Sequence, residues 1–501
     1  MSKKLLAFFL VFIILLIGSW LRFSGILSNS FAFTYDVGRD ILAVRNIIVD
    51  HKFSLIGPTT GVEGIFYGPW WYLILSIPFF LFSGNPQGIA FFMGLIGVAA
   101  ILLSFYVGKK IGGFFLGIVF SAFISVSSIL VSYSSQIWNP DIIPFFAVLT
   151  LLFLYTFAFE GKNVRKSISL FLGVIVGLII DLEIIFGFLF FLGILISLFF
   201  VFKKRLSVKI FLVFALGLLF VFFPRIIFEL RHNFLMTRKA IGFFSNEFLS
   251  SDKHSFFDVF LSRINSLFGT WNAALAGQNR IIGFILIILV FLSLLMFYKK
   301  TDNVKKQFIK TIFIIIGTFL IGLTFFGQEI WPHYLVGLPI FYILLFSLAV
   351  SVARDFLKNS WIIFILLSIL FWINLDPIQV LGNIRKPVWE GNAAVYRNQI
   401  AVIDYVYRNA GGQNFKYIAY TPAVHDYNYR YLFSWYGKKK YGYTPSEKNP
   451  QLFYVVIEPD YDLPFRLKDW LRLREGDGKV IKEEIVKGGI IVQKRLRNNE
   501  K

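Results

Sequence analysis

The chain contains no cysteine, and only 16% of its 501 residues are charged. The absence of cysteine excludes disulfide bonds and thiolate chemistry. Hydrophobic residues make up 57% of the chain, and the mean hydropathy is +0.69. So much apolar and so little charged sequence is not expected of a soluble protein. The composition is typical of a polytopic α-helical membrane protein.

Long apolar runs recur along the first three quarters of the chain. A helix that crosses a bilayer needs about 17–25 apolar residues. Runs of roughly this length predict about eleven membrane spans: 5–27, 88–108, 111–131, 142–159, 167–182, 184–202, 208–228, 281–298, 311–327, 333–352 and 360–375. The first span lacks a small-residue cleavage site, so we expect it to be retained as an anchor.

The formal charge of +21 is explained by membrane topology rather than by nucleic-acid binding. Basic residues gather in every second loop, as at Lys109-Lys110 and Lys299-Lys300. Short basic loops stay on the cytoplasmic side of a membrane. The loops 28–87, 132–141 and 229–280 and the tail after 375 are therefore expected on the outer face.

A twelfth apolar segment, 69–83, contains the group Trp70-Trp71-Tyr72. If this segment crossed the membrane, every later basic loop would lie outside. The charge pattern therefore predicts an in-plane or re-entrant helix at the outer interface, where Trp and Tyr are enriched. A conventional twelfth span is the alternative.

The tail changes character at about residue 376, where long apolar runs end and charge, Gly and Pro increase. This shift predicts two domains, a membrane domain at 1–375 and a small extracytoplasmic α/β domain at 376–501. A helix is expected at 397–409, and short strands at 415–420, 452–457 and 489–492. The tail has no Gly-rich phosphate loop, metal-spaced His pair or nucleophile elbow. Both an acceptor-handling role and a second catalytic unit remain open.

Two acidic clusters flank apolar spans on the expected outer face. Asp36 and Asp40 follow the first span, and Asp141 lies in Asn139-Pro140-Asp141 before the fourth. Charges at the rims of apolar helices are often functional. Each also has a structural explanation: Asp36 as a solvated loop acid, Asp40 as a partner of Arg39 or Arg45, and Asp141 as a helix N-cap.

Five short motifs follow one another in the first 350 residues. They are Phe33-Thr34-Tyr35-Asp36 with Asp40, Glu63 with Tyr67-Gly68-Pro69-Trp70-Trp71-Tyr72, Trp138-Asn139-Pro140-Asp141, Phe223-Pro224-Arg225 with Phe228-Glu229-Leu230-Arg231-His232, and Trp331-Pro332-His333-Tyr334-Leu335. In order and spacing the chain resembles integral-membrane glycosyltransferases of the GT-C superfamily, over roughly residues 5–350. The most similar groups are the protein O-mannosyltransferases, the lipid A aminoarabinose transferases and RgtA/B/C/D-like enzymes.

The resemblance implies a catalytic carboxylate in the first external loop, which is Asp36 here, with Asp141 and Glu63 as further catalytic candidates. It also implies a sugar donor carried on polyprenyl phosphate. A carboxylate that takes the proton of an acceptor hydroxyl would promote attack on the anomeric carbon, with inversion. The resemblance implies no obligatory cofactor, and a divalent metal remains open. A divalent metal on Glu63 with His232 or His254 is an alternative that the spacing does not support.

The leaving phosphate needs fixed donors. The candidates for binding donor and acceptor are Asp40, Arg39, Arg225, Arg231, His232 and His333. Arg231 has an alternative as an interfacial cation, and His333 as a helix cap. Arg225 is deep enough to need a partner, either Glu229 or a phosphate. Asp181 and Glu183 are expected only to form a turn.

Two positions depart from the family pattern. Gly64 stands where the aminoarabinose transferases commonly have a basic residue, and Val37 stands where the protein O-mannosyltransferases have a second carboxylate. The expected activity is transfer of a sugar from a polyprenyl-phosphate donor to a lipid, glycan or protein acceptor at the outer face of the cell membrane, although the Val37 departure gives a protein acceptor no support. A lipid-linked glycan transporter and a polymerase or ligase are the alternatives.

Overall fold

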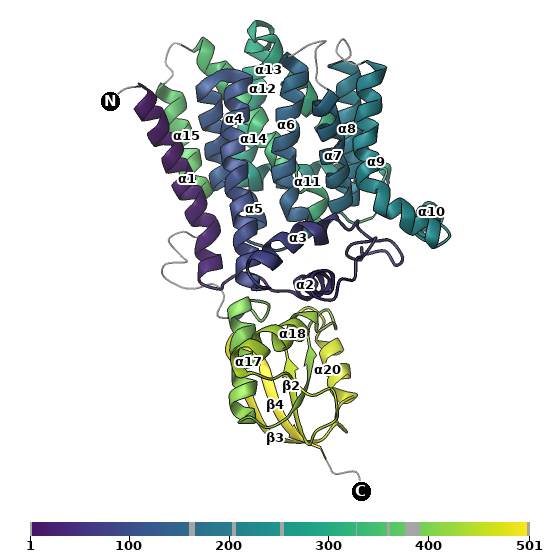
Figure 1. The fold of residues 1–501 in the computed structure, drawn as a ribbon. Coiled ribbons are helices and arrows are strands. Elements are labelled where there is room, and N and C mark those ends of the chain that lie inside the picture. The colour runs from purple at the N-terminus through teal and green to yellow at the C-terminus, as the bar shows by residue number, and fades with distance from the viewer. Residues whose placement is uncertain are drawn as a thin grey trace.

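The computed structural model describes residues 3–159, 166–202, 207–250, 255–326, 328–357, 361–375 and 391–497. It forms a bundle of long helices with a smaller sheet-containing unit at one end (Figure 1). We call residues 391–497 the C-terminal unit. The expected domain boundary after residue 375 adjoins 376–390, which lie outside the described residues.

Helices occupy the regions of all the expected spans. They are α1 Lys3–Leu27, α4 Pro86–Val126, α5 Ser128–Ser134, α6 Ile143–Phe159, α7 Lys166–Leu182, α8 Ile184–Phe200, α9 Val208–Arg231, α12 Arg280–Phe297, α13 Asn303–Thr324, α14 Leu338–Phe356 and α15 Trp361–Leu375. Seven apolar helical segments of 19 to 41 residues are long enough to cross a membrane by length and composition. Short 3-10 turns lie at Asn139–Ile142, Tyr298–Lys300, Pro332–Leu335 and Lys487–Gly489.

Helix α4 contains two of the expected spans. Its backbone leaves the helical conformation at Gly112 and Gly113, where φ of Gly113 is +85°. A Cβ on Gly108 would lie 2.8 Å from the Cα of Gly117, so the two arms of the hairpin approach too closely for any side chain there. The paired glycines allow the chain to reverse within a few residues, because glycine alone adopts this backbone conformation without strain.

The first outer loop forms two helices, α2 Tyr35–Ile48 and α3 Trp70–Leu81, which lie across the end of the bundle (Figure 1). Helix α3 has 12 residues, so it spans about 18 Å at 1.5 Å per residue, well short of the roughly 30 Å hydrocarbon core. Before α3, the Gly68 amide donates to the Asp181 carbonyl at 3.1 Å. After it, the Ser83 carbonyl accepts from Trp435 of the C-terminal unit at 2.9 Å. Helix α3 is thus a short helix at the end of the bundle, and its position in the plane of a membrane stays a prediction.

The expected long outer loop 229–280 is wrong in one respect, because most of it is helical. Helix α10 covers Leu235–Ser250 and α11 covers Phe256–Leu275. Helix α11 packs against α13 and α14, and its buried Arg263 donates to the carbonyl oxygens of Leu323, Phe326 and Gln328 at 2.6–3.0 Å. One face of α11 is apolar and the other polar, so its mean hydropathy does not reveal its burial.

The C-terminal unit is a four-stranded sheet covered by helices. The strands are β1 Lys416–Tyr420, β2 Leu452–Ile457, β3 Lys479–Ile485 and β4 Ile491–Leu496, and the helices are α17 Tyr396–Ala410, α18 Tyr427–Leu432, α19 Lys438–Tyr441 and α20 Pro464–Arg472, with a π-turn at Phe433–Gly437. The order is β1-β2-β4-β3, with β1 and β2 parallel and the other pairs antiparallel. The expected helix and strands are confirmed, and β3 is an addition. Its exposed residues form an edge strand that has no alternating apolar pattern.

The C-terminal unit is bonded to the first outer loop. The Phe33 amide donates to the Ala394 carbonyl at 2.7 Å, and the Tyr396 amide donates to the Phe31 carbonyl at 3.0 Å. Helix α18 packs on α2, where a Cβ on Gly38 would lie 2.3 Å from the backbone nitrogen of Asn428. The N-terminal end of α2 is therefore fixed directly against the unit.

Candidate functional site

Asp36, Arg39 and Asp40 lie together on the first turns of α2. The helix begins after Thr34, whose hydroxyl accepts from the Val37 amide, and residues three and four positions apart share one helix face. Arg39 therefore reaches both carboxylates, with 2.8 Å to Asp36 and 2.9 Å to Asp40. Asp36 is 26% exposed and Asp40 is 1% exposed. Of the two acids, Asp36 is the one accessible to a substrate.

Asp40 acts within the protein rather than toward a substrate. Its second oxygen accepts from the Trp71 indole at 2.8 Å. Burial raises the pKa of Asp40 to about 6, although Arg39 and Trp71 favour the ionised form. Of the two expected partners, Arg39 pairs with Asp40, whereas Arg45 pairs with Asp50 at 3.1 Å. Asp40 thus fixes Arg39 and joins α2 to α3.

Asp181 and Arg225 form a buried ion pair between α7 and α9. Arg225 donates through two nitrogens to one Asp181 oxygen, at 3.0 and 2.6 Å, and the Trp70 amide donates to the other at 3.3 Å. Asp181 is fully buried. A Cβ on Gly68 would lie 1.6 Å from the Asp181 carboxylate, so this approach requires glycine.

Asp181 corrects two expectations. The partner of Arg225 is not Glu229, which instead accepts from the amides of Met236 and Thr237 at 2.8 and 3.0 Å and caps α10. Asp181 also does more than form a turn, because it anchors the start of α3. Glu229 was the nearer acid in sequence, but it lies a turn further along α9 than Arg225 and points toward α10.

Glu183 joins three of the sequence motifs. Its carboxylate accepts from the Tyr67 hydroxyl at 2.8 Å and lies 3.9 Å from His333 Nε2. The His333 ring packs edge-on against Trp138 with centroids 4.9 Å apart, and Asn139 donates to the carbonyl of Leu182 beside Glu183 at 2.5 Å. The sequence did carry a signal for this site, since two carboxylates between apolar spans are costly unless they are paired.

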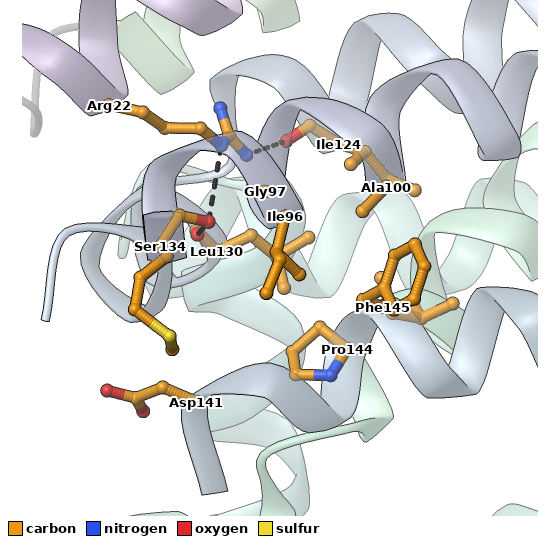
Figure 2. A pocket seen from close by; sticks show the side chains of 12 residues that line it. Arg22, Ile96, Gly97, Ala100, Ile124, Leu130, Ser134, Asp141, Pro144 and Phe145 are labelled. Carbon is orange, nitrogen blue, oxygen red and sulfur yellow. Dashed lines mark hydrogen bonds between the residues drawn. The ribbon is translucent and has the colours of Figure 1, made fainter. Parts of the chain in front are cut away.

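Asp141 lies in the 3-10 turn before α6 and is 6% exposed. Its Oδ2 atom has no hydrogen-bond partner in the part of the chain that the structure describes. It lines a cavity of about 20 Å³ together with Arg22 and Ser134 (Figure 2), a volume sufficient for one water molecule. The cavity keeps the acid and the guanidinium apart but facing a shared space.

Arg22 is a buried cation that sequence reasoning missed. It is 1% exposed and donates to Ser134 Oγ at 3.2 Å and to the carbonyls of Ile124 and Ser125 at 3.0 Å (Figure 2). These carbonyls lie at the C-terminal end of α4, where helix carbonyls lack intrahelical partners. The signal was a lone Arg within the apolar run of α1.

The remaining candidates lie apart from these clusters. Glu63 is exposed, and no hydrogen bond or ion pair joins it to Asp36 in the described part of the chain. Arg231 and His232 are exposed, and the His232 ring stacks on Phe228 with centroids 4.1 Å apart. His254 lies outside the described residues. Within the described ranges no three His, Asp or Glu side chains group as metal ligands, so Glu63 and His232 do not form part of such a group.

A basic side chain lies next to Gly64 in space rather than in sequence. The Lys239 side chain of α10 passes over Gly64, and its Cγ would be 2.9 Å from a Cβ at that position. The φ of Gly64 is +81°, a conformation that glycine tolerates best. The exposed Lys239 side chain therefore lies against the loop at Gly64.

A cavity beside Asp36 lies between α2 and the C-terminal unit. This cavity measures about 530 Å³. Thr34, Tyr35 and Asp36 line one wall, and Gln399, Thr421, Asn428, Glu458 and Tyr461 line the other. Asp36 therefore lines an open cavity to which both parts of the molecule contribute.

The fold combines a bundle of long helices, two helices of the first loop across the end of that bundle, and a terminal unit that contains the sheet. No family model matches the sequence, and no curated protein matches it. Among solved structures, ArnT from Cupriavidus metallidurans in the apo state aligns at 11% identity with a TM-score of 0.56 over 98% of this chain and 97% of ArnT. ArnT bound to undecaprenyl phosphate aligns at 12% identity with a TM-score of 0.54 over the same shares, 98% and 97%.

The Archaeoglobus fulgidus oligosaccharyltransferase in the apo form aligns at 15% identity with a TM-score of 0.50 over 86% of this chain. The chain spans 60% of the length of that protein. At these identities the comparisons establish the fold, and the resemblance to the GT-C superfamily is confirmed at that level.

Proposed function

We propose that this protein is a membrane glycosyltransferase that moves a sugar from a polyprenyl-phosphate donor to a hydroxyl group of an acceptor. The observation that carries the proposal is the position of Asp36, which is partly exposed, oriented by Arg39, and lines a cavity of about 530 Å³ at the end of an apolar helical bundle. The similar fold of ArnT, crystallised with undecaprenyl phosphate, supports a lipid-phosphate carrier.

The transfer step requires a base and a stabilised leaving group. The acceptor oxygen attacks the anomeric carbon as its proton passes to the Asp36 carboxylate. The bond from the anomeric carbon to the phosphate oxygen breaks, and its electron pair leaves with the carrier phosphate. Attack from the face opposite the phosphate inverts the anomeric centre. Arg39 holds the Asp36 carboxylate in position for this role.

The carrier phosphate needs cations that are free to receive it. Arg225 is committed to Asp181 at 2.6 Å, so we assign it to positioning α3 rather than to binding phosphate. Lys239 over Gly64 and the exposed Arg231 are the better candidates, because both side chains are accessible. Arg39, 18% exposed, is the remaining cation beside Asp36.

The charge distribution supports an orientation with the site on the outer face. Lys109, Lys110, Lys299 and Lys300 are exposed. Lys305 lies against Gly112 at the hairpin turn and pairs with Asp355 at 3.1 Å. In Figure 1 the connection between α12 and α13 and the turn within α4 lie at the end of the bundle opposite the C-terminal unit. Basic loops favour the cytoplasmic side, which leaves the C-terminal unit and the cavity outside.

The test is release of polyprenyl phosphate from a panel of polyprenyl-phosphate sugars by the purified protein. We expect Asp36→Asn to lower release about 10²–10⁴-fold, the usual contribution of a general base, and Asp141→Asn to impair it strongly. Asp50→Asn, an exposed acid at the end of α2, serves as the matched control. Release at the wild-type rate by Asp36→Asn would refute the base assignment.

The same assay separates the alternatives. A stable wild-type protein that releases no carrier from any donor favours a lipid-linked glycan transporter. Products that lengthen by repeated additions identify a polymerase, and transfer of a preassembled glycan identifies a ligase.

A further inference from the structure

We propose that the cavity between α2 and the C-terminal unit is the acceptor site, and that its ligand is an uncharged glycan. Its use as an acceptor site rests on the proposed function, whereas the binding of a glycan can be tested independently. Three features support this assignment: the polar groups on the wall of the C-terminal unit, the charge of these groups, and their position relative to Asp36.

The wall of the C-terminal unit presents buried hydrogen-bond acceptors that lack donors. Glu458 is 4% exposed and accepts from Gln399 Nε2 at 3.1 Å and from the Tyr429 hydroxyl at 2.9 Å. Gln399 and Asn428 are 0% and 1% exposed. Among the described residues, neither Gln399 Oε1 nor Asn428 Oδ1 has a hydrogen-bond partner. A buried acceptor without a donor is unfavourable, so a ligand that brings hydroxyl donors would satisfy this wall.

The charge of the cavity selects against anions. Among the described residues that line it are the carboxyl groups of Asp36 and Glu458, and none of those described lining residues is Lys, Arg or His. A phosphate or carboxylate ligand would meet acceptors and like charge, whereas hydroxyl groups donate to both amide oxygens and carboxylates. Tyr461 at the rim is 81% exposed and offers an aromatic surface to the apolar face of a sugar ring. The volume of about 530 Å³ lies within the range of roughly 300–1,000 Å³ for ligand pockets.

The site is placed so that a bound hydroxyl meets the base. Asp36 lies on the wall opposite Asn428 and Glu458. The contact of Gly38 with the Asn428 backbone leaves no room for a Cβ, so the two walls are in direct contact beside the cavity. The C-terminal unit therefore acts as an acceptor-binding module whose ligand is presented directly to α2.

The experiment is saturation-transfer NMR on the full-length protein in detergent, with methyl glycosides of glucose, galactose, mannose and N-acetylglucosamine as probes. Methyl glucuronide and inorganic phosphate are the anionic controls. We expect transfer to at least one neutral glycoside, at least a tenfold weaker affinity in Asn428→Ala and Tyr461→Ala, and no change in Glu484→Gln on exposed β3. Tyr461 is exposed, so its variant tests the site without disturbing the core.

Three results would overturn the inference: no transfer to any neutral glycoside, equal binding of methyl glucuronide, or unchanged binding in both cavity variants. Its failure can be told apart from failure of the proposed function. Carrier release that depends on Asp36, without glycoside binding, would refute only the proposal of an acceptor site. Glycoside binding by a protein that releases no carrier would refute only the proposed transferase function.

Discussion

The buried pair of Asp181 and Arg225 allows stability and catalysis to be separated in one set of variants. Asp181→Leu leaves Arg225, 13% exposed in the wild type, without its bidentate partner between α7 and α9. It also removes the acceptor for the Trp70 amide. The variant therefore perturbs the packing of the bundle and the anchor of α3 together.

The expected cost follows from burial. Removing one partner of a buried ion pair leaves an uncompensated charge and costs about 3–5 kcal/mol. The double variant Asp181→Leu/Arg225→Leu leaves no such charge, and apolar replacement of a whole buried pair is often neutral or stabilising. Asp50→Asn breaks a pair whose side chains are 35% and 41% exposed, and exposed pairs contribute about 0–1 kcal/mol.

The assay combines thermal unfolding in detergent with carrier release. We expect the unfolding midpoint to fall by several degrees in Asp181→Leu, to recover in the double variant, and to change little in Asp50→Asn. Carrier release should stay low in the double variant, because the Trp70 amide still lacks its acceptor and α3 no longer holds Trp71 against Asp40. Two results would contradict these expectations: an unfolding midpoint of Asp181→Leu equal to that of the wild type, or carrier release by the double variant at the wild-type rate.

Two further predictions concern the other buried charges. Burial raises the pKa of Asp40 to about 6. Carrier release should therefore fall as the pH drops through 6, because the protonated carboxyl releases Arg39. This fall should be absent from the pH profile of Asp40→Asn. Stability should change in the opposite direction: the folded carboxyl holds its proton more tightly than the unfolded chain does, so this contribution is lost as pH rises from 3.8 to about 6. Arg22→Met should lower carrier release to the level of Asp141→Asn, and the double variant should be no worse than either, because groups that share one cavity are not additive; additive losses in the release rate would show that Arg22 and Asp141 act separately.

Features set by local pattern were predictable from the sequence. Hydropathy located the helices of the bundle. The alternation of basic loops predicted that 69–83 does not cross the membrane, and the structure has a helix of only 12 residues there. The periodic apolar residues of 397–409 and the short apolar runs after it located α17 and three of the four strands. In the described structure these assignments differ by a few residues at the ends.

Features set by long-range pairing were not predictable. The partner of Arg225 is Asp181, 44 residues earlier in the chain, whereas the sequence offered only the nearby Glu229 or a phosphate. Tyr67 and Glu183 meet across 116 residues, and a turn of two acids gives no sign of what will approach it. Helix α11 was taken for loop because burial of an amphipathic helix depends on neighbours that hydropathy does not identify.

The bonds between the first loop and the C-terminal unit have a consequence for synthesis. The Tyr431 hydroxyl donates to the Gly84 carbonyl across 347 residues, and the Trp435 indole donates to the Ser83 carbonyl across 352. Contacts between segments this far apart can form only after nearly the whole chain has left the ribosome. A nascent or prematurely terminated chain would have its bundle in the membrane but an unclosed first loop. Such a chain would lack one wall of the cavity beside Asp36. A truncated product is therefore not expected to hydrolyse the lipid-linked sugar donor.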